Sequence, residues 1–192
     1  VKRSIFVLLD WFSILPICVV ITFFCFSYLF IITPVSGDSM IPNISNGEHV
    51  FVSYNTEIKR GSVVILEVNK DDNFHIDETS HYIKRIIGLP GDRVKWINNK
   101  LYINDEEYNE PYFPKDYFGT AATNNFDGLF RYIDENGNEQ VTEIIPEGYY
   151  FVMGDNRPIS KDSRSIGLIP EKNIIGVATY HMNFIIPRGK IK

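Results

Sequence analysis

An uninterrupted apolar run near the N-terminus constrains the architecture of this chain most. The 22 residues from Trp11 to Ile32 include no charged side chain. A helix of that length spans about 33 Å at about 1.5 Å per residue, and the hydrocarbon core of a bilayer is about 30 Å thick. We therefore predict a transmembrane helix over residues 11–32, preceded by a cytoplasmic N-terminus at 1–10 and followed by an extracytoplasmic domain at 33–192.

The residues that flank the run predict its orientation. Lys2 and Arg3 precede it, and the positive-inside rule keeps such a terminus in the cytoplasm. The expected location is the cell membrane, with a single pass and the following domain outside. A cleaved secretory signal is the alternative. Its apolar region usually covers 7–15 residues, and Pro34 and Ser36 form a poor small-residue cleavage site, so a retained anchor is favoured.

After the run, short alternating or apolar segments are separated by turn signals, and no long helical period follows. This pattern predicts a mainly β domain. The candidate strands are His49–Tyr54, Ser62–Val68, His81–Ile87, Arg93–Ile97, Lys100–Ile103, Gly148–Met153 and Ile174–His181.

Two polar regions interrupt this pattern. Residues 71–80 are expected to form a loop. Residues 104–142 are expected to be an insertion on one face of the domain, because they hold too few apolar residues for a core of their own. Within the insertion, residues 129–133 and 139–144 predict a hairpin about Asn136-Gly137.

Composition excludes several classes of partner and cofactor. The net charge is −5, so no basic stripe is available for nucleic acid. Both cysteines, Cys18 and Cys25, lie in the apolar run, so the outer domain has neither a disulfide nor a cysteine-based zinc site. No metal or organic cofactor is expected.

A serine and a lysine are the candidate catalytic pair. A serine hydroxyl needs a nearby base to take its proton, and lysine can serve if burial lowers its pKa from about 10.4 toward 7–8. Ser39 follows the apolar run by seven residues, and Lys84 lies among apolar neighbours in a predicted strand. The alternatives are a surface lysine and a Ser-His-Asp triad, whose histidine would be one of His49, His75, His81 and His181.

Three motifs occur in order along the chain: GDSMIP at residues 37–42, YIKRIIGLPGD at 82–92 and GDNRPISKDSR at 154–164. Together with the preceding apolar run, they resemble the bacterial type I signal peptidases, the membrane-anchored Ser-Lys peptidases of family S26. The resemblance covers the chain from the anchor to about residue 180, apart from the insertion. It implies an antiparallel β-sheet catalytic domain.

The resemblance assigns roles to residues at matching positions. Ser39 corresponds to the nucleophile, Lys84 to the general base and Ser160 to the serine that orients the lysine amine. The backbone N–H of Ser39 corresponds to an oxyanion donor. Gly37 stands where Gram-negative members have a serine, as in Gram-positive-type members, so the resemblance supplies no second side-chain donor. The residues expected to give structural support are Arg85, Asp155, Asp162 and Arg164.

The resemblance also implies the substrate, which is a preprotein carrying a signal peptide with small residues before the scissile bond. The residues expected to line the two shallow substrate pockets are Val35, Ser36, Met40, Tyr82 and Ile83. At Asn43 the family usually has threonine. The expected partners are preproteins and the lipid bilayer, with a link to the secretion translocon or to pilus assembly left open.

Two other functions are alternatives. A non-catalytic assembly factor, for example for pilins, would lack the serine or the lysine, whereas this chain retains Ser39, Lys84 and Ser160. A self-cleaving Ser-Lys repressor would need a DNA-binding segment before the catalytic domain, where this chain has the apolar run.

Overall fold

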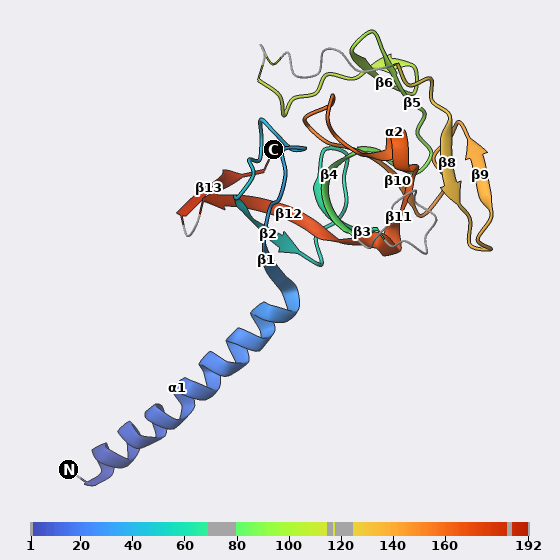
Figure 1. The fold of residues 1–192 in the computed structure, drawn as a ribbon. Coiled ribbons are helices and arrows are strands. Elements are labelled where there is room, and N and C mark those ends of the chain that lie inside the picture. Colours follow the sequence, from blue (N-terminus) through green and yellow to red (C-terminus); the bar gives the residue numbers. More distant parts are fainter. Residues whose placement is uncertain (1, 69–79, 115–116, 118–124, 184–185, 192) are drawn as a thin grey trace. The chain divides into compact units, whose positions relative to one another are not determined.

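The computed structural model describes residues 2–68, 80–114, 117, 125–183 and 186–191 (Figure 1). The stretch predicted to be a loop, residues 71–80, lies outside these ranges except for Ser80, and so does His75. The chain divides into two compact units, Val1–Ile31 and Ile32–Lys192.

The first unit is built on one helix, α1 (Lys2–Leu29). The helix begins nine residues before the predicted start and ends at Leu29 rather than Ile32, because strand β1 (Phe30–Pro34) begins there. The aromatic and β-branched residues of that strand favour extended backbone, and Pro34 disfavours a helical residue before it.

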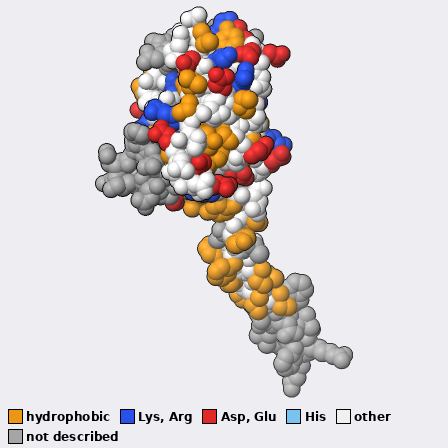
Figure 2. All heavy atoms as spheres, turned by 90° about the vertical axis from the view of Figure 1, so that its right-hand side faces the viewer, with side chains coloured by type: hydrophobic (Ala, Val, Ile, Leu, Met, Phe, Trp, Pro, Cys, Tyr) orange, Lys and Arg blue, Asp and Glu red, His pale blue; other side chains and the backbone are white. Residues whose placement is uncertain are grey.

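Apolar side chains cover the described surface of α1 (Figure 2), with Phe23 and Phe24 66% and 67% exposed. Among the helices that the described residues form, none combines the length and the apolar character needed to cross a membrane.

The second unit is built around an eight-stranded sheet. Its strands in spatial order are β1, β2 (His49–Ser53), β12 (Ile174–Asn183), β3 (Val63–Val68), β4 (Ser80–Gly88), β10 (Tyr149–Met153) and β11 (Ile169–Pro170), while β13 (Ile186–Lys190) pairs with β12. From β2 to β11 all neighbours run antiparallel, as do β12 and β13. The predicted mainly β, antiparallel architecture is confirmed.

The seven predicted strands are all present, with ends shifted by at most two residues. Sequence reasoning missed β1, β7 (Glu106–Glu107), β11 and β13, together with the short helices α2 (Ser163–Ile166) and η2 (Glu171–Asn173). β11 and the two short helices hold two to four residues each, too few to show a period of either kind.

The sheet lies between two hydrophobic cores, as the side chains of β3 show. Val64 and Leu66 belong to one core, whereas Val63 and Ile65 belong to the other. Because successive side chains of a strand point to opposite faces, β3 is buried on both sides. This burial fixes the register of its neighbour β4, in which Lys84 lies opposite Val64.

Two smaller sheets complete the unit. One is formed by β5 (Val94–Ile97), β6 (Lys100–Ile103) and β7 (Glu106–Glu107), and the other is the predicted hairpin, formed by β8 (Phe130–Ile133) and β9 (Glu139–Thr142). The described part of the insertion shares its core with the rest of the domain, since Tyr112 and Phe130 pack in one cluster with Trp96 and Phe151.

Candidate active site

Ser39 lies in a loop, residues 36–44, between β1 and β2. The loop turns at Gly37, whose φ of 90° is a conformation that side chains other than glycine rarely adopt. The N–H of Asn156 donates to the carbonyl oxygen of Ser39 at 2.9 Å, and Nδ2 of Asn156 donates to that of Asp38 at 3.1 Å. Met40 is fully buried beneath the loop. The loop is therefore fixed on both sides of Ser39.

Lys84 reaches Ser39 from strand β4. Its Nζ donates to Ser39 Oγ at 3.0 Å and to the carbonyl oxygen of Ile83 at 2.9 Å. The side chain is almost completely buried, and Nζ lies 5.2 Å from the centre of the Tyr82 ring. The two predicted catalytic residues, 45 positions apart in the sequence, are thus within the hydrogen-bond distance that a nucleophile and its base require.

Burial lowers the pKa of Lys84 from 10.5 to about 8, and the negative charges of Asp162 and Asp155 partly offset this effect. A lysine can accept a proton only when its amine is neutral. With a pKa near 8, roughly one amine in ten is neutral at pH 7, compared with fewer than one in a thousand for an ordinary lysine. The environment of Lys84 therefore suits a general base.

This pKa predicts how activity depends on pH. Below about pH 8 the rate of cleavage should rise about tenfold per pH unit, and it should level off above about pH 9. The check is kcat/KM against pH, and a profile without a rise in this range would contradict Lys84 as the base.

The lowered pKa of Lys84 also predicts how stability depends on pH. Because the pKa is lower in the folded state, the unfolded chain binds more protons between about pH 8 and 10.5. The free energy of unfolding should therefore increase with pH in that window.

The four predicted support residues form two ion pairs. One joins Arg85 of the YIKRIIGLPGD motif to Asp155 of the GDNRPISKDSR motif, and the other lies within the GDNRPISKDSR motif. Nε and Nη2 of Arg85 donate to the two carboxylate oxygens of Asp155 at 2.8 and 2.7 Å, and both side chains are completely buried. Arg164 donates from Nε and Nη2 to Asp162, both at 2.8 Å. Asp162 also caps α2 and accepts the N–H of Gly154 at 3.0 Å.

Ser160 lies near the nucleophile, but its predicted contact with Lys84 is not formed. Its Oγ is buried and has no hydrogen-bond partner among the described residues. A Cβ built on Gly154 would lie 2.2 Å from this Oγ and 2.6 Å from the carbonyl oxygen of Ser39. Only glycine at position 154 therefore lets the backbone there come so close to Ser39 and Ser160. A role for Ser160 in orienting the base stays a prediction.

A cavity of about 210 Å³ opens beside the pair. Its lining residues are Thr33, Pro34, Val35, Ser36, Ser39, Ile65, His81, Tyr82, Ile83 and Lys84. Four of the five predicted pocket residues are among them. The fifth, Met40, does not line the cavity and has no exposed surface, whereas Val35 and Ile83 of the same core keep a small exposed part. The alternative base His81 also lines the cavity. Its Nε2 lies 3.4 Å from Oε2 of Glu67, whereas Ser39 Oγ is hydrogen-bonded to Lys84.

Sequence reasoning missed several polar residues around the site. Arg157, within the GDNR motif, is buried and donates to the carbonyl oxygen of Gly154 at 3.0 Å, and its guanidinium pairs with Glu110. Glu110 belongs to the insertion, and no local pattern marks it as the partner of Arg157. Among the described residues, no group of three or more His, Cys, Asp or Glu side chains is placed to hold a metal ion.

Comparison with known proteins identifies the family. A family model described as signal peptidase, peptidase S26, matches residues 8–182. The chain is 37% identical to signal peptidase IB of Staphylococcus aureus (strain Mu50 / ATCC 700699) over 182 residues, which cover 90% of this chain and 88% of the relative. It is 40% identical to signal peptidase I S of Bacillus subtilis (strain 168) over 184 residues, 93% of this chain and 89% of the relative.

Among solved structures, a signal peptidase I from Enterococcus faecalis V583 matches with a TM-score of 0.46 and 26% identity, covering 65% of this chain and 98% of that one. On the family model and the two relatives, the chain belongs to the signal peptidase family, peptidase S26. The resemblance based on the three motifs is confirmed.

Proposed function

We propose that this protein removes N-terminal signal peptides from exported preproteins, with Ser39 as nucleophile and Lys84 as general base. The observation that carries the proposal is the 3.0 Å hydrogen bond between Lys84 Nζ and Ser39 Oγ at a cavity in a member of this peptidase family. The lowered pKa of Lys84 supports it, because a base must be neutral to act.

The geometry supports a two-step reaction. Ser39 Oγ attacks the scissile carbonyl carbon while its proton passes to Lys84 Nζ. The oxyanion accepts a hydrogen bond from the Ser39 N–H, which has no acceptor among the described residues. Lys84 then gives its proton to the departing amine of the mature protein. In the second step a water molecule, deprotonated by Lys84, hydrolyses the acyl-enzyme and releases the signal peptide with a new carboxylate.

The cavity is proposed to hold the residues before the scissile bond. At about 210 Å³, it has room for small side chains, and Val35 and Ile83 give it apolar walls. The substrate would lie extended between the segment before Ser39 and strand β4, so that its backbone pairs with theirs. Ser36 and Tyr82 would contact the same stretch of substrate.

We further propose that residues 11–32 anchor the protein in the cell membrane, with the N-terminus cytoplasmic and residues 33–192 outside. The support is the uncharged sequence, the two basic residues before it and the exposed apolar side chains of the described part of α1. Alkaline extraction should leave the protein in the membrane pellet, and protease added outside intact cells should degrade the part after residue 32. Release by alkali would contradict the anchor.

The proposed function is tested with purified full-length protein in detergent and a purified preprotein. Mass spectrometry should find a single cut after a small residue at the end of the signal peptide. The matched control is the same preprotein with a bulky residue before the cut, which the cavity cannot hold. Absence of cleavage for every preprotein tried would contradict the proposal.

A further inference from the structure

The nucleophile loop is also attached to the domain four residues beyond Ser39. The Nδ2 amide of Asn43 donates to Oδ2 of Asp155 at 2.7 Å. Asp155 is completely buried, and both of its oxygens also accept hydrogen bonds from Arg85. Charge-assisted hydrogen bonds to a buried carboxylate are stronger than those between neutral groups. A strong contact therefore joins the loop to a buried ion pair.

This contact closes a ring of interactions around the catalytic pair. From Ser39 the chain runs to Asn43, and hydrogen bonds lead from Asn43 to Asp155 and on to Arg85. Arg85 follows Lys84 directly on β4, and Lys84 Nζ returns to Ser39 Oγ. Each link is a peptide segment or a hydrogen bond of 3.0 Å or less. Movement of Asn43 away from Asp155 would therefore loosen the loop that carries the nucleophile.

The far side of the ring is fixed to the rest of the domain. Nη1 of Arg85 donates to the carbonyl oxygen of Gly61 at 2.8 Å, and the guanidinium lies 4.0 Å from the centre of the Tyr112 ring. The carboxylate of Asp155 thus cannot move with the loop without breaking the contacts of Arg85. Asn43 is thus attached to an ion pair that has further contacts with the rest of the domain.

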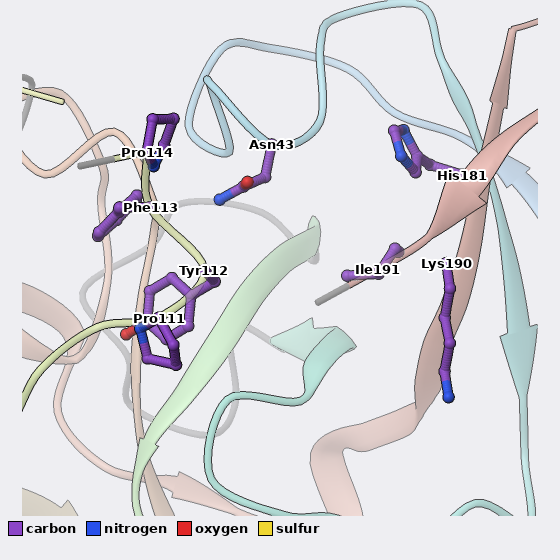
Figure 3. Close-up of a pocket in the computed structure, with 8 residues that line it drawn as sticks. All are labelled: Asn43, Pro111, Tyr112, Phe113, Pro114, His181, Lys190 and Ile191. Carbon is purple, nitrogen blue, oxygen red and sulfur yellow. The ribbon is translucent and has the colours of Figure 1, made fainter. Parts of the chain in front are cut away.

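Packing alone does not hold Asn43 in place. Its side chain lies at the edge of a cavity of about 340 Å³, between the segment of Tyr112 and Phe113 and the segment of His181 and Lys190 (Figure 3). Because one side of Asn43 faces this open space, the hydrogen bond to Asp155 is the contact that fixes its direction.

We propose that Asn43 is a positioning residue, which holds the loop of Ser39 at the distance from Lys84 that proton transfer requires. The inference rests on the proposed Ser39–Lys84 pair. A neutral amide suits this position because it donates to Asp155 without adding charge. A carboxylate there would face the carboxylate of Asp155, and like charges so close repel.

The test compares Asn43→Leu, which is similar in size but cannot donate, with Asn43→Asp, which replaces the donor by a charge. Both should lower kcat by roughly tenfold to a hundredfold, the loss expected when reacting groups are misplaced by about 1 Å. KM should change less than about twofold, because the proposed substrate cavity is untouched. In Asn43→Asp the rate should also reach its midpoint at higher pH, since a nearby negative charge favours protonated Lys84.

Three controls make the result decisive. Asn125→Asp makes the same chemical change at an exposed amide whose oxygen accepts the N–H of Asn98, and it should leave kcat unchanged. Asn43→Thr keeps a donor and the residue usual in the family, and it should retain most of the activity even if Asn43→Leu fails to fold. Ser39→Ala shows whether the assay depends on the proposed nucleophile.

The inference would be overturned if folded Asn43→Leu had an unchanged kcat, or if the substitution changed only KM. Asn43→Thr as inactive as Asn43→Leu would also overturn it. If Ser39→Ala cleaves at close to the rate of the unchanged protein, the proposed catalytic pair is wrong, and this failure is distinct from failure of the role of Asn43 alone.

Discussion

Ser39→Ala is expected to reduce cleavage of a preprotein by about 10⁴-fold or more, because removing a nucleophile abolishes the covalent route altogether. Lys84→Met, which keeps the length of the side chain and removes the amine, should give a loss of the same order. The hydrogen bond between these side chains means that they act as one unit. The double variant should therefore be no worse than either single variant.

Matched controls for this pair are available on the surface of the domain. Lys59→Met removes an exposed lysine, and Ser62→Ala removes a serine whose hydroxyl accepts the N–H of Lys59. Neither should change kcat/KM. Product formation is followed by mass spectrometry with the folded state of each variant checked by circular dichroism. Cleavage by folded Ser39→Ala at a rate close to that of the unchanged protein would rule out Ser39 as the nucleophile.

The largest effect on stability is expected for Asp155→Ala. This change leaves the completely buried guanidinium of Arg85 without its carboxylate, and Asn43 without its acceptor. Breaking a buried pair from one side costs about 3–5 kcal/mol of folding free energy. For a domain of this size each kcal/mol lowers the melting temperature by about 2–4 °C, so a fall on the order of 10 °C is expected.

Replacing both partners separates the ion pair from its surroundings. In the double variant Arg85→Met, Asp155→Leu neither charge of this pair is left buried without its partner, so much of the lost stability should return although activity should not. Glu57→Ala, which breaks an exposed pair with Lys59, should leave the melting temperature unchanged. A thermal melt of Asp155→Ala that matches the unchanged protein would show that Arg85 is satisfied by other groups.

Local sequence patterns were enough to predict most of the sheet, whereas the proposed catalytic residues were recognised through the resemblance of three motifs to a known family. The strand that carries Lys84 ends at a Pro-Gly turn, and Ser39 lies in a short motif, although the local pattern around Lys84 alone also fits a surface lysine. Met40 lies in the same motif, yet its depth in the core could not be deduced because burial depends on segments distant in sequence.

Contacts between distant segments could not be predicted in the same way. Asn43 and Asp155 are 112 positions apart, and Glu110 and Arg157 are 47 apart. A buried arginine needs an acid, but many acids lie along the insertion and no period singles out Glu110. The boundary of α1 was misplaced for a related reason. The apolar residues near position 30 are compatible with either a helix or a strand, and pairing in the sheet decides between them.

The position of β12 in the sheet has a consequence for biosynthesis. This strand, residues 174–183, lies between β2 and β3, which are complete by residue 68. A growing chain therefore contains the serine and the lysine long before it contains the strand that joins their parts of the sheet, and also before Asn156, which holds the loop of Ser39. No fragment that stops before residue 174 can contain the whole sheet. The proposed catalytic pair is thus synthesised early, and the segments that support it are synthesised last.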